Sequence, residues 1–366
     1  MEKAYTHNIL LFADRLPPLV GGMEMHAYYF IKHFTNHKHF PLLEVVTKNL
    51  EGQDCIIFEE KLKPINLNNL TNSTKPTFVF FNSGRWIEEL KGIRELFPEA
   101  IFIYRTGGNE ILKAPLNGNY TFDYPMRQKY WVSTLNNSID LMITNSAYTE
   151  NRLENLGITC TFARCVGGAN IHVLHISRII QNNFTTIFCG ARFVPYKNHS
   201  LLLTVINNLV KLGHNIKLRL AGDGPLLSHI KRQALEEGIS SNVEFLGSLS
   251  NEQNCKEIAE ADIYMQLSSD YVTEVPGGSY IHSEGMGRSI LEAITAGTFV
   301  IAGSSGALPE IVTKERGMLV DLDNTEDITN QIDHILKNPP NKLPYCHDYS
   351  WERLFSYYER IFEGYA

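Results

Sequence analysis

Two basic residues, Arg192 and Lys197, have the types and the spacing of an anion-binding pair. They lie in the segment CGARFVPYKNHSLLL, residues 189–203, after an apolar run that predicts a strand and before a predicted helix. An arginine binds an anion as a two-pronged fork and a lysine binds it as a point charge, a combination that suits a diphosphate. For this segment alone, two solvated charges on a surface loop are the simpler interpretation.

Two carboxylates, Glu284 and Glu292, stand in a glycine-rich segment, HSEGMGRSILEAITAG, residues 282–297. Gly285 and Gly287 allow the backbone to approach a ligand closely, and the N-terminus of the helix that follows favours a phosphate. A carboxylate beside it can accept hydrogen bonds from two hydroxyls of a sugar or a ribose. An exposed helix residue is the competing interpretation for Glu292.

A glycine pair, Gly21 and Gly22, precedes the first predicted helix. Backbone N–H groups and the helix dipole favour an anion at such a position. The pair alone is a weak indication, because most such pairs are ordinary loops. It does not form the G-x-G-x-x-G motif of dinucleotide-binding proteins.

The elements that must position these residues are apolar runs that alternate with amphipathic segments, a pattern typical of βαβ units and a parallel sheet. Helices are predicted from about Met23, at 199–212 and from about Ser350, and a polar loop is predicted at 61–76. The predicted strands are 8–13, 43–47, 77–82, 100–104 and 140–144 in the first half, and 185–190, 217–222, 242–247, 261–266, 298–303 and 317–322 in the second.

The length of 366 residues predicts two domains, since a domain usually takes about 100 to 200 residues. The alternation breaks at residues 166–184, where we place the boundary. The expected domains are 1–170 and 171–348, and the apolar stripe of 349–366 predicts a C-terminal helix that packs on the first domain. Two such α/β halves leave a cleft between them, and ligands bind at the carboxyl ends of parallel strands.

Composition excludes several classes of protein. The chain is 43% hydrophobic and 20% charged, so a largely disordered chain is excluded. Residues 1–170 carry no net charge and residues 171–366 carry a net charge of −7, so there is no basic footprint for nucleic acid. No apolar run is long enough to span a membrane and no signal-peptide layout is present, which predicts a cytoplasmic protein.

The cysteines and histidines give no indication of a metal site. The six cysteines are scattered without a C-x-x-C pair and are best interpreted as reduced core residues. His33 and His37 have the spacing of two metal ligands on one helix face, but a solvated helix end is the better interpretation.

Taken in order, the motifs resemble those of glycosyltransferase family 4. Besides Gly21-Gly22, they are G-x-R-x4-K at 190–197, A-G-D-G-P at 221–225, F-L-G at 245–247 and the pair Glu284 and Glu292, which leads into E-A-x-x-A-G at 292–297. The resemblance covers most of 185–365 densely and the N-terminal half sparsely. It implies the α/β GT-B fold, with an acceptor-binding and a donor-binding Rossmann-like domain, and a retaining transfer from a nucleotide sugar.

The resemblance also implies roles for particular residues. Arg192 and Lys197 hold the donor diphosphate and, with Glu284 at the donor sugar, form the catalytic set. Glu292 holds the ribose hydroxyls, and the base lies near Gly247. The full set of donor-binding residues implied in this way is Gly21, Gly22, Gly190, Gly247, Gly285, Met286, Gly287, Arg288 and Glu292.

The sequence departs from the family pattern in two places. Fourteen residues, 270–283, lie between Ser268-Ser269 and Glu284, where relatives have only a few. This predicted loop is either a lid or acceptor contact or a plain surface insertion. The histidine that many relatives place after the strand at 100–104 is absent. Arg105 or Asn109 is expected to bind the acceptor there, and a structural turn at Gly107-Gly108 is the alternative.

The expected function is that of a retaining hexosyltransferase in the synthesis of a bacterial cell-surface glycan. A UDP-sugar donor is favoured over a GDP-sugar, and no cofactor or metal is expected, since no D-x-D motif is present. A glycan, a lipid-linked sugar or a protein is the expected acceptor, with peripheral association at the inner face of the membrane left open. The alternatives are a nucleotide-sugar epimerase and a non-catalytic nucleotide-sugar-binding subunit; a dehydrogenase is disfavoured.

Overall fold

The computed structural model describes residues 7–16, 21–48, 65, 67–70, 75–82, 84–116, 123–170, 184–338 and 343–365. The chain divides into two compact units. The first comprises Met1–Val166, Glu274–Tyr280 and Trp351–Ala366, and the second comprises Gly167–Thr273 and Ile281–Ser350. Within the predicted boundary segment 166–184, residues 171–183 lie outside the described residues.

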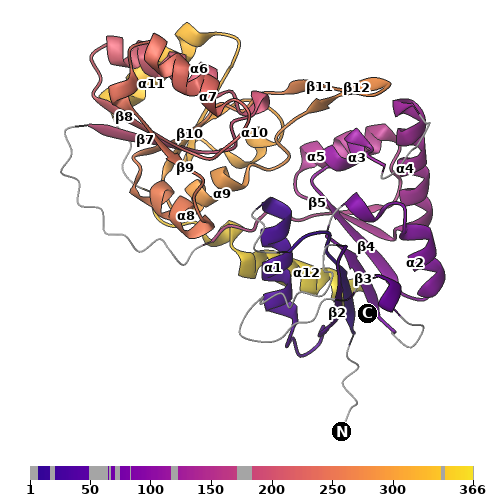
Figure 1. Ribbon diagram of the computed structural model, residues 1–366. Helices are drawn as coiled ribbons and strands as arrows, with labels where there is room; N and C mark the ends of the chain where they lie inside the picture. Colours follow the sequence, from indigo (N-terminus) through magenta and orange to yellow (C-terminus); the bar gives the residue numbers. More distant parts are fainter. Residues whose placement is uncertain are drawn as a thin grey trace. The chain divides into compact units, whose positions relative to one another are not determined.

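The first unit is built on a six-stranded parallel sheet of order β2-β1-β3-β4-β5-β6 (Figure 1). Its strands are β1 (Ile9–Phe12), β2 (Leu42–Val46), β3 (Phe78–Phe81), β4 (Ile101–Thr106), β5 (Leu141–Thr144) and β6 (Thr161–Arg164). Its helices are α1 (Gly22–Phe34), α2 (Leu90–Leu96), α3 (Asn109–Lys113), α4 (Tyr124–Ser138), α5 (Ala147–Leu156) and α12 (Trp351–Tyr365), with short 3-10 turns η1 (Leu67–Asn69) and η2 (Gly84–Trp86).

The predicted strands of this half are confirmed, and β6 is the strand that the sequence pattern misses. β6 lies at the edge of the sheet, and its four side chains are exposed or half-buried, so it lacks the apolar run that announces a buried strand. The turn η1 lies within the predicted loop 61–76; residues 61–64, 66 and 71–74 of that loop are outside the described residues.

Both faces of the first sheet are covered by helices. Successive residues of a strand point to opposite faces, so the fully buried runs of β1 and β3 feed two separate cores. One core contains Ile9 and Phe80 with residues of α1 and α12, and the other contains Leu10 and Phe81 with residues of α2, α4 and α5. This is the doubly wound arrangement expected from the alternating pattern.

Helix α12 packs on the first sheet, as the fold prediction requires. Its residues Trp351, Leu354, Phe355, Tyr358 and Phe362 are buried against α1 and the sheet, whereas Ile361 is only half-buried. The Tyr358 hydroxyl hydrogen-bonds the Nε2 atom of His26 on α1 at 3.0 Å. Burial, reinforced by the nearby Arg105, lowers the pKa of His26 well below its ordinary value, so this buried ring is neutral.

The second unit repeats the architecture with a parallel sheet of order β14-β13-β10-β7-β8-β9 (Figure 1). Its strands are β7 (Thr185–Gly190), β8 (Ile216–Ala221), β9 (Val243–Gly247), β10 (Ile263–Gln266), β13 (Phe299–Gly303) and β14 (Gly317–Val320). Its helices are α6 (His199–Lys211), α7 (Leu227–Glu236), α8 (Asn251–Glu260), α9 (Arg288–Thr295), α10 (Leu308–Ile311) and α11 (Thr325–Lys337), with turns η3 (Pro195–Lys197), η4 (Ser240–Asn242) and η5 (His347–Tyr349).

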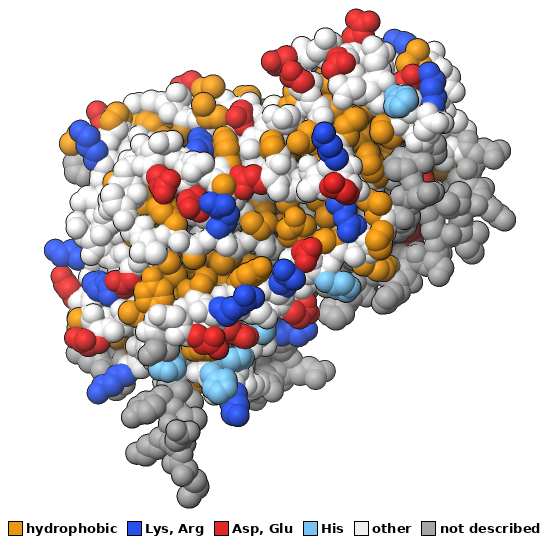
Figure 2. Space-filling view, turned by 180° about the vertical axis from the view of Figure 1, so that it is seen from behind, with side chains coloured by type: hydrophobic (Ala, Val, Ile, Leu, Met, Phe, Trp, Pro, Cys, Tyr) orange, Lys and Arg blue, Asp and Glu red, His pale blue; other side chains and the backbone are white. Residues whose placement is uncertain are grey.

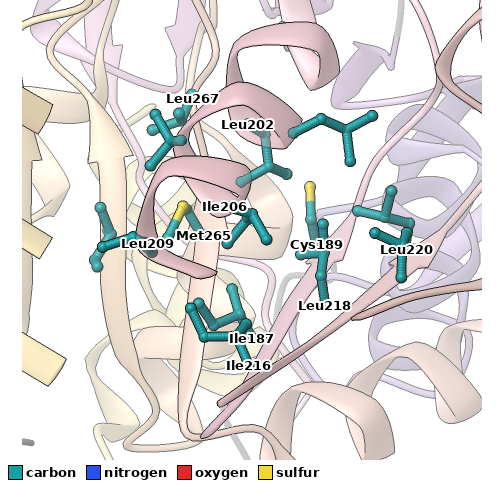
Figure 3. Packing of buried hydrophobic residues seen from close by; sticks show 14 of the residues in the cluster. Ile187, Cys189, Leu202, Ile206, Leu209, Ile216, Leu218, Leu220, Met265 and Leu267 are labelled. Carbon is teal, nitrogen blue, oxygen red and sulfur yellow. The ribbon is translucent and has the colours of Figure 1, made fainter. Parts of the chain in front are cut away.

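The predicted apolar face of α6 packs on the second sheet. Leu202, Ile206 and Leu209 lie over Ile187 and Met265, side chains of two adjacent strands (Figure 3). Helices α7 and α11 contribute to the same core, and α8 and α9 contact strands from the opposite face. The sheet is therefore held rigidly enough to fix the loops at its carboxyl edge.

The inserted segment 270–283 is not a loop but a two-stranded hairpin of β11 (Tyr271–Val275) and β12 (Gly278–His282). The link is the dipeptide Pro276-Gly277, and Gly277 has a φ of +84°, which glycine adopts without strain. Alternating β-branched, aromatic and polar residues around this turn are a hairpin signal. The prediction of a loop rested on the turn residues Pro276, Gly277 and Gly278 and missed the alternation on either side of them.

The described surface carries both signs of charge. On the face shown in Figure 2, the Lys and Arg side chains are interspersed with Asp and Glu. Among the described residues, no helix is long and apolar enough to cross a membrane. Of the five described cysteines, four are buried and Cys160 is half-buried, and all five are free thiols; Cys55 lies outside the described residues.

Candidate active site

Arg192 and Lys197 lie where the sequence places them, in the segment between β7 and α6 that includes η3. Tyr196, between them, contacts both. The Arg192 guanidinium donates a hydrogen bond to the Tyr196 hydroxyl at 2.8 Å, and the Lys197 ammonium lies 5.8 Å from the centre of the Tyr196 ring. The two cations are thus held by one loop at the carboxyl end of the sheet.

Lys197 also forms an ion pair with the carboxylate of Glu284, 87 residues further along the chain. The two side chains are 14% and 16% exposed, so the pair is largely shielded from water. Burial alone raises the pKa of Glu284, but the adjacent Lys197 ammonium more than reverses this effect, and the pKa of Glu284 is lower than its ordinary value. Glu284 is therefore a carboxylate at neutral pH.

A buried polar network stands behind Glu284 at the end of β10. The Gln266 amide donates to the Glu284 carboxylate at 3.3 Å and to the Ser268 hydroxyl at 2.9 Å, and that hydroxyl in turn faces Glu284 at 3.4 Å. The Tyr264 hydroxyl donates to the side-chain oxygen Oε1 of Gln266 at 2.9 Å and so fixes the orientation of the side-chain amide. These contacts hold the carboxylate in one place.

Tyr196 and His282 are site residues that the sequence reasoning missed. The His282 ring lies 4.0 Å from the Tyr196 ring, centre to centre, with 32° between the planes. His282 is the last residue of β12, so the end of the hairpin is coupled through Tyr196 to the Arg192 guanidinium. The aromatic residue directly before Lys197 was the signal available in the sequence; its partner, 86 positions away, had none.

Glu292 is a buried residue of α9, only 3% exposed, so the interpretation as an exposed helix residue is wrong. Amides on α8 donate to its two carboxylate oxygens, Asn251 at 3.1 Å and Asn254 at 3.3 Å, and the Arg288 Nε lies at 3.7 Å. Burial raises the pKa of Glu292, and these donors oppose that shift. The two glutamates therefore have pKa shifts of opposite sign, because only Glu284 has an ammonium group in contact.

Two glycines of the donor prediction, Gly190 and Gly287, lie close to these carboxylates or their partners. A Cβ atom at Gly190 would come within 2.2 Å of the Asn254 side-chain oxygen, so α8 can approach the end of β7 only where that residue is glycine. Gly287 caps the N-terminus of α9 with a φ of +74° and no side-chain hydrogen bond. Gly285 and Met286 lead into that cap, and Gly247 ends β9.

The other predicted residues belong to the first unit. Gly21 and Gly22 begin α1. Arg105 ends close to the Tyr358 hydroxyl, where its charge opposes the rise in the pKa of Tyr358 that burial causes. Asn109 is the first residue of α3. Within the second unit, the structure brings together Arg192, Lys197 and Glu284, and it places Glu292 with Gly190 around α8.

One group with metal-ligating side chains occurs among the described residues, formed by His33, His37 and Glu359 of the first unit. The Nε2 atoms of His33 and His37 lie 2.5 and 3.3 Å from the same Glu359 oxygen. The Nδ1 atom of His37 accepts from the Phe40 N–H at 3.1 Å, so the proton of the neutral ring is on Nε2, the atom that faces Glu359. This arrangement favours a hydrogen-bonded pair of α1 and α12 over a metal site.

Comparison with known proteins gives a family match for the segment that contains this site. Residues 174–350 match the family model described as glycosyl transferases group 1. A GDP-mannose-dependent monoacylated alpha-(1-6)-phosphatidylinositol monomannoside mannosyltransferase of Corynebacterium glutamicum is 31% identical over 153 residues, 42% of this chain and 38% of that protein. Protein CapJ of Staphylococcus aureus is 31% identical over 137 residues, 37% of this chain and 32% of that protein. The chain thus spans about two fifths or less of these relatives.

Solved structures resemble the chain over nearly its whole length. Anabaena HepE in complex with UDP and glucose has a TM-score of 0.73 at 14% identity and covers 98% of this chain and 100% of its own. The lipopolysaccharide outer core galactosyltransferase WaaB has a TM-score of 0.68 at 13% identity and covers 98% and 99%. At such identities the likeness shows the fold, which is that of GT-B proteins. Residues 174–350 therefore match the glycosyl transferases group 1, and the chain as a whole has the GT-B fold that its sequence predicted.

Proposed function

We propose that this protein is a retaining glycosyltransferase that moves a sugar from a nucleotide-diphosphate sugar to an acceptor in the synthesis of a cell-surface glycan or glycolipid. One observation carries the proposal: inside the family segment, Lys197 is paired with the largely buried Glu284 at the carboxyl end of the sheet, on the loop that also holds Arg192. Cations on a rigid loop and a carboxylate that stays ionised are what this reaction requires.

The reaction breaks the bond between the anomeric carbon and the donor phosphate. Negative charge develops on the departing diphosphate, and Arg192 and Lys197 stabilise it; one preorganised charge partner is typically worth about 10²–10³ in rate. Positive charge develops on the sugar, and the Glu284 carboxylate stabilises it. The acceptor oxygen forms the new bond on the face that the phosphate leaves, and its proton passes to the phosphate oxygen, so the configuration is retained.

Glu292 has the properties of a ribose-binding group. Its two oxygens are oriented by Asn251 and Asn254, and an oriented carboxylate can accept hydrogen bonds from two vicinal hydroxyls. The donor is proposed to be a UDP-sugar. The relatives' names mention both nucleotides, GDP-mannose for the Corynebacterium enzyme and UDP for HepE, so the donor panel must contain both.

The acceptor is proposed to be a lipid-linked sugar or a growing surface polymer. Two of the matching proteins are named for transfer to phosphatidylinositol mannosides and for synthesis of alpha-monoglucosyldiacylglycerol, and both products are glycolipids. These names support the class of acceptor and leave its identity to experiment.

The test measures nucleotide release from UDP-, GDP-, ADP- and CDP-sugars, with and without cell-envelope acceptors. We expect slow release from one donor and acceleration by one acceptor pool, with a product whose anomeric configuration, read by NMR, equals that of the donor. Arg192→Ala and Lys197→Ala should each lose at least 100-fold in rate, whereas Lys211→Ala, an exposed lysine at the end of α6, should not.

We expect substitutions of Glu284 and Glu292 to affect different steps. Glu284→Ala is expected to lower the rate of transfer, and Glu292→Ala is expected mainly to weaken donor binding. Conversion of the donor sugar to an isomer without any acceptor would indicate an epimerase. Absence of both release and donor binding by calorimetry would indicate a non-catalytic protein, and either result would overturn the proposal.

A further inference from the structure

A second charged site lies in the first unit, at the carboxyl ends of the adjacent strands β1 and β3. It is a pocket lined by Asp14, Arg15, Met23, Glu24, Asn82 and Arg85. Asp14 and Arg15 follow β1, and Asn82 and Arg85 follow β3, so the pairing of these two strands brings them together. None of these residues takes part in the donor chemistry described above.

The pocket holds two guanidinium groups over one buried carboxylate. The Nε atoms of Arg15 and Arg85 approach the same Asp14 oxygen, at 3.5 and 3.3 Å. The Asp14 side chain is 10% exposed, whereas those of Arg15 and Arg85 are 40% and 55% exposed. Asp14 balances one of the two guanidinium groups that it contacts, so Asp14, Arg15 and Arg85 together carry one positive charge.

The second acid of the lining, Glu24, lies in the first turn of its own helix, α1. Its carboxylate lies against Gly21, where an added Cβ would come within 2.3 Å of one of its oxygens. An acid in the first turn of α1 interacts favourably with the exposed amides of the helix N-terminus. The N-terminus of α1 therefore offsets part of the charge of Glu24.

Arginines also mark the carboxyl ends of two further strands of this sheet, Arg105 in β4 and Arg164 in β6. Each has a partner of its own, since Arg105 lies near Tyr358 and the Arg164 Nε pairs with Glu150 at 3.2 Å. Arg15 and Arg85 differ because they share a single carboxylate. A planar guanidinium held through Nε can still present its two terminal NH₂ groups to a phosphate or carboxylate.

We propose that this pocket binds an anionic group, a phosphate or a carboxylate, carried by the acceptor. The inference rests on the proposed transferase function and gives its acceptor a chemical class. Arg15 and Arg85 would bind the anion, and Asp14 orients them from below. An acceptor without such a group would leave the two cations with one counter-charge and would bind more weakly.

The test uses three probes with one sugar ring, namely glucose, glucose 6-phosphate and glucuronate, and measures their binding to the full chain by calorimetry. We expect at least one of the two anions to bind ten-fold or more tightly than glucose, and the comparison between them tells phosphate from carboxylate. Arg15→Gln and Arg85→Gln should each weaken that anion about ten-fold or more, as expected for loss of a charged hydrogen bond. The matched control Arg353→Gln/Arg360→Gln removes two exposed arginines of α12 and should change nothing.

A variant that is expected to strengthen anion binding tests whether the arginines bind the anion or only maintain the structure. Asp14→Asn removes the competing carboxylate and should tighten anion binding several-fold. Equal binding of all three probes, unchanged binding in the arginine variants, or weaker binding in Asp14→Asn would each overturn the inference.

Nucleotide release without acceptor separates this inference from the function on which it rests. Normal release in a protein that does not distinguish the probes would overturn the acceptor pocket and leave the transferase proposal standing. Anion binding in a protein that releases no nucleotide would overturn the proposed function, and with it the acceptor role of the pocket.

Discussion

The ion pair between Lys197 and Glu284 should make the stability of the second unit depend on Lys197. Lys197→Met keeps most of the unbranched side chain and removes its charged end, so the Glu284 carboxylate is left largely buried without a cation. Breaking a buried pair in this way typically costs about 3–5 kcal/mol. Here both side chains keep some exposure, and Gln266 and Ser268 still face the carboxylate, so we expect a smaller loss of about 2–3 kcal/mol.

The loss should depend on pH in a defined direction. In the wild type the pKa of Glu284 is lowered, so the stabilisation by the pair is complete above the pKa of an unfolded glutamate, about 4.3, and disappears as the pH falls through the folded value. In Lys197→Met, the largest cause that lowers the pKa of Glu284 is removed, and burial, which raises this pKa, is opposed only by weaker groups such as Ser268 and His282. The carboxyl of the variant then takes up a proton at a higher pH than that of the wild type, so the difference in stability between the two should be larger at pH 7 than at pH 4.

The distribution of tryptophan allows the two units to be followed separately. All three tryptophans, Trp86, Trp131 and Trp351, belong to the first unit. In urea unfolding, tryptophan fluorescence therefore reports the first unit, and far-UV circular dichroism reports both. We expect Lys197→Met to shift a transition that is seen by circular dichroism and to leave the fluorescence transition in place.

A double variant isolates the pair itself. Lys197→Met/Glu284→Gln removes both charges and should cost less than about 1 kcal/mol, because no buried charge is left unpaired. Lys211→Met, an exposed lysine of α6, serves as the control. The reasoning would be refuted if Lys197→Met matched this control at pH 7, or if the double variant were as unstable as the single one.

Three further predictions concern the second unit. Tyr196→Phe removes the hydroxyl that holds Arg192, and we expect about a 3- to 10-fold weaker UDP affinity by calorimetry with unchanged unfolding; unaltered affinity would contradict a positioning role. Burial, aided by nearby Lys197, lowers the pKa of His199 from 6.5 to about 4. As the pH falls, His199 therefore takes up its proton at a higher pH in the unfolded chain than in the folded one. The free energy of unfolding should fall by about 3 kcal/mol between pH 7 and pH 4. His199→Phe should largely remove that loss in acid unfolding curves, and an identical pH profile would refute it. Gly297 has a φ of +70°, and a Cβ there would lie 2.0 Å from the Leu343 carbonyl oxygen, so Gly297→Ala should lower the free energy of unfolding by more than about 1 kcal/mol. A urea midpoint equal to that of the wild type would disprove this.

The sequence was sufficient wherever a local pattern decides the structure. The apolar runs of β1 and β7 and the helical stripe of α6 predict elements that the structure confirms, because the period of burial along a strand or a helix is written in consecutive residues. The ordered motifs from Gly190 to Gly297 also predict a glycosyltransferase, in agreement with the family model that residues 174–350 match. The sequence pattern missed edge strand β6 for the same reason: its side chains are exposed or half-buried, so its residues do not form a buried apolar run.

Contacts between residues distant in the sequence were decided only by the tertiary structure. The burial of Glu292 depends on α8 lying against α9. The contact of Tyr196 with His282 depends on where strand β12 ends relative to the loop that carries Tyr196. Neither neighbour can be read from the residues around the site. A side chain's pKa and its orientation follow from such neighbours, so they were decided at the same level.

The pocket of Arg15 and Arg85 shows the division most clearly. The sequence by itself determined that both arginines follow strands of a parallel sheet. It did not determine that β1 and β3 are adjacent, because strand order depends on which crossover connections the packed helices allow. Only that order places two cations, 70 residues apart in the chain, over the single carboxylate of Asp14.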